Sequence, residues 1–258
     1  MNLMNRKEIK ILITFFIIYS FFVYWDGWDE EGHLSLVKSI VYEGRIQTDN
    51  FYEFSGDRYY FNGHYYSPKP PALALLSVPP YAISNLIYFN VLQPNITESP
   101  IIEVQKRPSL DTNYTFELLN YKIITPFESI SRILVTIFTS CLFSALSVVL
   151  MYKFSDFITD NEKQKILFTV TYGLGTMVLP SAIVYTGFAV SAFFSFLSFY
   201  ILFKIKHKKL KGDRYFFLSG IILCLGFLTR YSAFIYFLLC FVYIFFVDRK
   251  KIFIFILF

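Results

Sequence analysis

The stretch IKILITFFIIYSFFVYWDGWDEEGHLSLVKSIVYEG, residues 9–44, decides the fold because it joins an apolar run to a polar, acidic segment. Residues 9–25 are apolar except for Lys10 near their start, and Trp25 and Trp28 stand where the run ends. The run is too long for the core of a signal peptide, and tryptophan is typical of a membrane interface. We therefore predict a first membrane span at residues 9–25, followed by a polar segment at the membrane surface.

The whole chain has the composition of a polytopic membrane protein. Of its 258 residues, 55% are hydrophobic and 21% are aromatic. Several apolar runs approach the ~20 residues that cross a bilayer as a helix. We predict an all-α polytopic membrane protein with one domain, residues 1–258. Its six transmembrane helices are predicted at about 9–25, 131–152, 166–183, 185–203, 215–229 and 232–247. A final apolar run at 252–258 predicts a truncated seventh helix, as in an N-terminal fragment.

Charge predicts the orientation of these spans. Residues 26–130 hold 13 acidic and 7 basic residues, whereas the rest of the chain holds 6 acidic and 17 basic ones. An apolar run at 73–92 is long enough to span, but Pro79-Pro80 interrupts it, and a span there would put the basic loop 204–214 outside. We therefore place 73–92 in the outer interface as a surface helix. The N-terminus is then cytoplasmic, and residues 26–130 form a large outer loop.

An acidic pair, Asp29-Glu30, opens the first candidate site. Asp29 is expected to cap a helix that runs to about residue 43, where Gly44 ends it, and that lies along the membrane surface. The acidic residues then serve only as a helix cap and an anchor. In the alternative, Asp29 is a general base or a metal ligand beside an apolar surface. His33 is interpreted as a hydrogen-bonding surface residue, with a place in a metal site as the alternative.

The second candidate site follows in YYFNGHYYSPKPP, residues 59–71. Asn62-Gly63 predicts a hairpin turn, and the prolines after Lys69 suit the first turn of the next helix. A lysine at a helix N-terminus would form a phosphate site at the membrane surface, and a lysine that only snorkels is the alternative. The other candidate substrate-binding residues of this region are Arg58, His64 and Tyr66.

Two arginines near the outer ends of predicted spans form the third candidate. Arg132 begins the second span, and Arg230 interrupts the apolar stretch 215–247, where it predicts a tight outer turn. An arginine in an apolar region usually has a partner. That partner is either a lipid headgroup or a lipid-linked phosphate.

The order of these features resembles the C-type membrane glycosyltransferases (GT-C). It is most similar to the protein O-mannosyltransferases and the lipid A aminoarabinose transferases. The resemblance covers nearly the whole chain, but its specific part is confined to residues 29–71, with the acidic pair Asp29-Glu30 and with Lys69 before Pro70. It implies a sugar donor linked to polyprenyl phosphate, a base at Asp29 and a contact between Lys69 and the lipid phosphate.

Two departures from this family bear on the site. The aminoarabinose transferases have a Glu where this chain has Pro68, and they carry an Asp in an outer turn that matches residues 184–189, where this chain has no carboxylate. The second departure weakens the case for a metal site, so no metal ligands are assigned and a divalent metal stays an open alternative.

We predict an inverting glycosyltransferase that moves a sugar from a polyprenyl-phosphate donor to a hydroxyl acceptor at the outer face of the cell membrane. The acceptor is a protein, a lipid or a glycan, and nucleic acid is not a partner. The apolar surface beside the 73–92 helix is expected to hold the polyprenyl chain. Asp29 and Lys69 are therefore expected to lie close together. The alternative is a non-catalytic protein that binds or transports polyprenyl lipids, or an inactive fragment.

Overall fold

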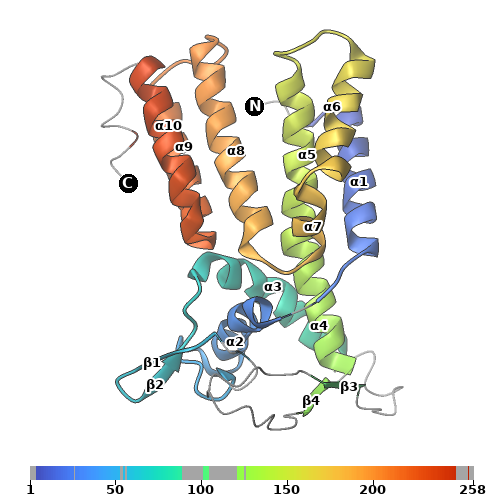
Figure 1. Cartoon of the computed structure of the whole chain (residues 1–258), viewed down its shortest axis with the longest axis vertical. Helices are drawn as coiled ribbons and strands as arrows, with labels where there is room; N and C mark the ends of the chain where they lie inside the picture. The colour runs from blue at the N-terminus through green and yellow to red at the C-terminus, as the bar shows by residue number, and fades with distance from the viewer. Residues whose placement is uncertain are drawn as a thin grey trace, which may run out of the picture.

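The computed structural model has two tiers, an upper bundle of helices and a lower tier of helices with two β-hairpins (Figure 1). The structure describes residues 4–25, 27–52, 55, 57–88, 101–104, 121–124, 126–247 and 255. These residues are mostly helical, which confirms the predicted helical class.

Seven helices form the upper tier within the described residues. They are α1 (Arg6–Phe21), α5 (Leu142–Ser155), α6 (Glu162–Gly175), α7 (Val178–Ile183), α8 (Gly187–Lys206), α9 (Arg214–Thr229) and α10 (Phe234–Val247). Two helical segments, 128–155 and 187–206, are long and apolar enough to cross a membrane. The predicted turn at Arg230 separates α9 from α10, with a short 3₁₀ turn at Tyr231–Ala233.

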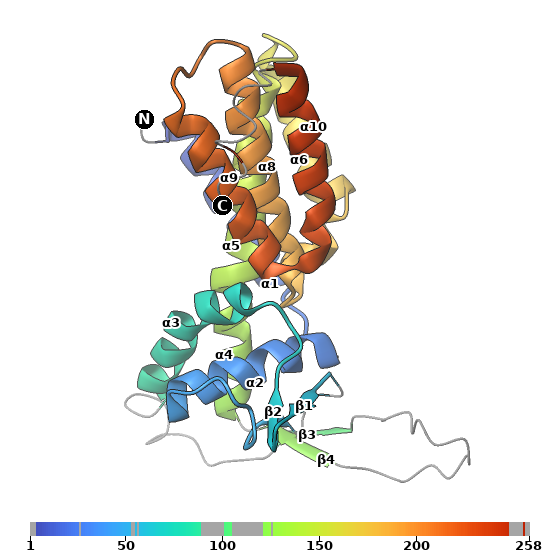
Figure 2. The ribbon, with the colours of Figure 1, turned by 90° about the vertical axis from the view of Figure 1, so that its left-hand side faces the viewer.

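A continuous helical rod joins the two tiers. It consists of α4 (Pro126–Thr136), one π-helical turn at Ile137–Cys141, and α5. The sequence predicted this helix at 131–152, but it begins earlier and carries α4 below the bundle, as Figure 2 shows. The lower end of the rod therefore packs among the helices of the lower tier.

The span predicted at 166–183 is not one helix. It breaks where α6 ends at Gly175, because Thr176 has an extended backbone, and it resumes as α7. The carbonyl of Ile183, at the end of α7, accepts a hydrogen bond of 2.8 Å from the amide of Tyr24. This contact fastens the end of α7 to the chain segment that leaves α1.

In the lower tier, α2 (Trp28–Glu43) begins after Gly27 and ends at Gly44. Gly44 has a φ of 64°, so the predicted stop is confirmed. The predicted cap at Asp29 was wrong, since Gly27, with a φ of 112°, precedes the helix and Asp29 lies in its first turn. There its negative charge still interacts favourably with the positive end of the helix dipole.

The prediction that α2 lies along a membrane surface was also wrong. Every residue from 30 to 39 is buried: α3 (Pro71–Ile87) packs on the helix, α4 pairs with it through ion pairs, and the segment after Gly44 hydrogen-bonds to it. Its side chains Leu34 and Val37 pack in one apolar core with Leu73 and Tyr81 of α3. The helix is thus the centre of the lower tier.

The proline pair does not interrupt α3, contrary to expectation. Pro79 and Pro80 lie inside a helix that runs from Pro71 to Ile87, and Pro71 occupies its first turn as predicted. Proline removes a backbone donor and disfavours the helix, so burial of Leu73, Pro80 and Tyr81 must offset that penalty.

The predicted hairpin is confirmed. Strands β1 (Tyr59–Phe61) and β2 (His64–Tyr66) pair antiparallel, and Asn62 and Gly63 have φ values of 50° and 86°. Positive φ at both central residues is the mark of a type I′ turn. A second hairpin, β3 (Ile101–Val104) with β4 (Tyr121–Ile124), was not predicted. The predicted seventh span at 252–258 lies outside the described residues except for Phe255.

Candidate functional site

Four charged side chains meet where the lower tier touches the bundle, and we call them the ionic cluster: Asp29, Asp57, Lys69 and Arg230. The ammonium of Lys69 contacts the carboxylate of Asp29 and lies 2.7 Å from Oδ2 of Asp57. The guanidinium of Arg230 lies 3.2 Å from Oδ2 of Asp29. Asp29 therefore has both cations as partners, whereas Asp57 contacts Lys69.

The chain between the hairpin and α3 brings Lys69 to Asp29. The hydroxyl of Ser67 donates a hydrogen bond of 2.7 Å to the carbonyl of Gly32 in α2. A Cβ at Gly32 would lie 3.4 Å from two carbons of the Lys69 side chain, an ordinary van der Waals contact, so the Lys69 side chain runs along this turn of α2. The expected proximity of Asp29 and Lys69, 40 residues apart, is thus present in the structure.

A second close approach places Arg230. A Cβ at Gly187 would lie only 2.3 Å from the carbonyl oxygen of Thr229, so the absence of a side chain lets the start of α8 touch the end of α9. Cζ of Arg230 then lies 3.4 Å from the centre of the Phe188 ring, a cation–π contact. This contact holds the guanidinium beside Asp29.

The cluster is partly exposed, with 28% of the Asp29 side chain, 21% of Lys69 and 28% of Arg230 accessible to solvent. Burial alone would raise the pKa of Asp29, but the hydrogen bond and charge of Lys69 hold it below the usual value. Burial would likewise lower the pKa of Lys69, but its bonds to Asp29 and Asp57 raise it. The carboxylate of Asp29 and the ammonium of Lys69 are thus both charged at neutral pH.

Two predicted site residues lie in the interior instead. Glu30, in the first turn of α2, is 1% exposed. Arg132 pairs with Glu31, each side chain 5% exposed, and its guanidinium lies 4.9 Å from the centre of the Trp25 ring. A buried arginine with a carboxylate partner is part of the packing between α4 and α2, which does not support the predicted contact of Arg132 with a lipid phosphate.

The hairpin residues are bound to one another rather than to the cluster. Nδ1 of His64 lies 2.8 Å from Asp49, and the amide of Tyr65 donates to the same carboxylate. The guanidinium of Arg58 lies over the rings of Tyr52 and Tyr65. Tyr66 ends β2, opposite Tyr59 of β1. The structure therefore does not bring Arg58, His64 or Tyr66 into the ionic cluster.

Sequence reasoning missed two residues of the site, Asp57 and Phe188, and it interpreted a third, His33, as a surface residue. Asp57 and Phe188 have no distinctive sequence pattern, and only the fold brings them to Lys69 and Arg230. His33 was interpreted as a surface residue, but it is 1% exposed. Its position four residues after Asp29 had indicated that both residues lie on one helix face, which was the basis of the metal-site alternative.

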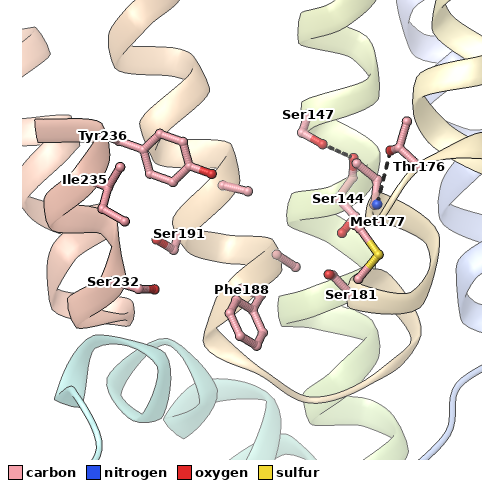
Figure 3. Close-up of a pocket in the computed structure, with 13 residues that line it drawn as sticks. Ser144, Ser147, Thr176, Met177, Ser181, Phe188, Ser191, Ser232, Ile235 and Tyr236 are labelled. Carbon is pink, nitrogen blue, oxygen red and sulfur yellow. Dashed lines mark hydrogen bonds between the residues drawn. The ribbon is translucent and has the colours of Figure 1, made fainter. Parts of the chain in front are cut away.

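A cavity of about 500 Å³ opens beside the cluster, and Figure 3 shows its lining. Phe188, the ring beneath Arg230, forms part of the wall. The other labelled lining residues are Ser144, Ser147, Thr176, Met177, Ser181, Ser191, Ser232, Ile235 and Tyr236. A second cavity of about 530 Å³ shares Ala192 and Tyr236 with the first and continues past Phe199. The two cavities lie next to each other along α8, both with mainly apolar linings, and we call them the groove along α8.

Within the described residues, no group of three or more His, Cys, Asp or Glu side chains is arranged to hold a metal ion. The two carboxylates of the cluster instead face an ammonium group. No protein-family model matches the chain, and no curated protein or solved structure matches it either. Chemically, the cluster offers two cations that can bind a phosphate and a carboxylate that can accept a proton.

Proposed function

We propose that the chain is a C-type membrane glycosyltransferase that moves a sugar from a polyprenyl-phosphate donor to a hydroxyl group. The observation that carries this proposal is the ionic cluster, where Lys69 and Arg230 converge on Asp29. Cations bind the phosphate of such a donor, and a carboxylate within their reach can activate an acceptor.

We further propose six membrane crossings, with the N-terminus and the basic loops in the cytoplasm. Three shorter apolar helices, 71–87, 214–229 and 231–246, accompany the two long ones. In Figure 1 the start of α1 and the basic loop between α8 and α9 lie at the end of the bundle away from the lower tier. The positive-inside rule then supports a lower tier at the outer face, where α3 would lie in the interface.

The chemistry proceeds by displacement at the anomeric carbon of the sugar. The donor phosphate takes Lys69 and Arg230 as partners, which frees Asp29 from both ion pairs. Asp29 accepts the proton of the acceptor hydroxyl, whose oxygen forms the new bond to the anomeric carbon. The bond between that carbon and the phosphate oxygen breaks, its electron pair stays on the polyprenyl phosphate, and the anomeric configuration inverts. The two cations stabilise the departing charge.

The groove along α8 suits the polyprenyl chain. It begins at Phe188, which also touches Arg230, so a lipid whose phosphate lies in the cluster would enter the groove directly. Apolar walls such as Ile235 and Phe199 would then bury the chain. This location replaces the surface beside α3 that the sequence suggested.

A second function rests on the same residues. Lys69 and Arg230 lie beside Asp29 in this structure. Two neighbouring cations also suit a protein that binds polyprenyl phosphate without transferring a sugar. Binding then occurs without release of free polyprenyl phosphate.

A measurement of donor turnover distinguishes the two functions. The protein would be reconstituted in vesicles with short polyprenyl-phosphate donors that carry glucose, mannose, N-acetylglucosamine or aminoarabinose, and with a membrane extract as the source of acceptors. We expect one donor to release polyprenyl phosphate in proportion to the amount of protein. Retention of intact donor in every case, although the donors bind, would instead support the binding protein.

A further inference from the structure

His33 is a buried titratable group directly behind the ionic cluster. It is 1% exposed, it follows Asp29 by one helical turn, and its ring packs edge-on against Tyr185, with 6.0 Å between ring centres. Its Nδ1 is buried and makes no hydrogen bond within the described part of the chain. A polar atom buried without such a bond is unfavourable, so the imidazole is held there by the fold around it.

The charges around His33 come from four segments of the chain. Asp29 belongs to α2, Asp57 precedes β1, Lys69 precedes α3, and Arg230 follows α9. The two carboxylates favour a protonated imidazole and the two cations oppose it. Because these formal charges sum to zero, burial is the deciding influence, and it lowers the pKa of His33 to about 4. The imidazole is therefore neutral in the arrangement of charges that the structure shows.

An anion in the cluster changes this balance. A phosphate bound by Lys69 and Arg230 offsets the two positive charges that oppose protonation of His33. It also draws both cations away from Asp29, leaving that carboxylate without the partners it has in this structure. Both effects favour a proton on the imidazole.

We propose that His33 is a positioning residue that takes up a proton when a phosphate binds between Lys69 and Arg230. The protonated ring gives Asp29 a new cationic neighbour, so Asp29 stays ionised and can act as a base when the acceptor arrives. The proton comes from solvent and returns to solvent when the phosphate leaves. This inference rests on the proposed phosphate site, and it requires phosphate binding alone.

The pH dependence of phosphate binding tests the inference, because proton uptake and ligand binding are linked. A group that binds a proton more tightly in the complex makes the complex tighter as pH falls. The probe is farnesyl methyl phosphate, a phosphodiester whose own charge is constant between pH 5 and 8. We expect it to bind wild-type protein roughly fivefold more tightly at pH 5 than at pH 7.5, with the uptake of roughly half a proton or more per ligand at pH 5.

Calorimetry in two phosphate-free buffers of different ionisation enthalpy counts the protons taken up. In His33→Gln we expect the probe to bind with neither proton uptake nor pH dependence. His207→Gln is the matched control, because His207 caps the far end of α8 and is exposed, and it should behave like the wild type. Proton uptake that survives in His33→Gln would overturn the proposal and point to Asp29 as the group that takes the proton.

A second readout uses the wild-type protein in case His33→Gln does not fold. The chain has three histidines, so the ¹⁵N signals of labelled imidazoles can be assigned to His33 by elimination, with His64→Gln and His207→Gln. At pH 5 we expect His33 to be mostly neutral without the probe and mostly protonated at saturation. A neutral His33 in the saturated protein contradicts the inference and leaves the phosphate site intact. Failure of the probe to bind wild-type protein refutes the phosphate site itself, and this inference with it.

Discussion

Asp29→Asn is expected to lower the turnover number about 10²- to 10⁴-fold, because the variant lacks the carboxylate that accepts the proton of the acceptor hydroxyl. The same substitution should tighten binding of farnesyl methyl phosphate about two- to fivefold, because Lys69 and Arg230 no longer pair with Asp29. Asparagine keeps the size of the side chain, so the fold of α2 should survive. Turnover of polyprenyl-phosphate donors and equilibrium binding of the probe are the two measurements.

Asp57→Asn is the matched comparison for this variant. Asp57 also contacts Lys69, at 2.7 Å, and it belongs to the same cluster. We expect a similar tightening of probe binding and a decrease in turnover of less than about tenfold, since the proton acceptor is still present. Equal losses of turnover in the two variants would show that Asp29 has no special role as a base.

Arg132→Met is expected to destabilise the lower tier by about 3–5 kcal/mol, because Glu31 would lose its guanidinium partner in a buried place. The measurement is the free energy of unfolding in detergent, followed by the near-UV signal of the aromatic residues. The double variant Glu31→Gln with Arg132→Met should recover most of the loss, because neither charge is then buried.

Arg45→Met is the control for this stability prediction. Nε of Arg45 lies 2.7 Å from Glu43, but 38% of the arginine side chain is exposed, and surface ion pairs contribute about 0–1 kcal/mol. Its removal should therefore change the free energy of unfolding far less than Arg132→Met does. If the two arginine variants have the same free energy of unfolding, the ion pair between Glu31 and Arg132 does not hold α4 to α2.

Local features of this chain were the ones that sequence reasoning predicted well. The turn at Asn62-Gly63 and the end of α2 at Gly44 need a positive φ, and the chain supplies residues that tolerate it. The start of α3 at Pro71 follows from the fixed φ of proline. Each of these depends on two or three neighbouring residues, so the sequence alone was sufficient.

Features that depend on distant segments were predicted poorly. Glu31 and Arg132 are 101 residues apart, and only the packing of α4 on α2 turns a predicted lipid contact into a buried ion pair. The break after Gly175 and the intact helix through Pro79-Pro80 likewise depend on what packs around them. The meeting of Asp29 and Lys69 was expected from a family resemblance, whereas Asp57 and Phe188 had no such guide.

The central claim is that Lys69 and Arg230 together hold a phosphate beside Asp29, and binding of farnesyl methyl phosphate at pH 7.5 tests it most directly. Lys69→Gln and Arg230→Gln should each weaken binding about 10- to 100-fold, the range expected for loss of a charge-assisted hydrogen bond. Arg45→Gln removes an exposed cation that pairs with Glu43 rather than Asp29, and it should bind like the wild type. Affinities within twofold of the wild type for both cluster variants would contradict the account.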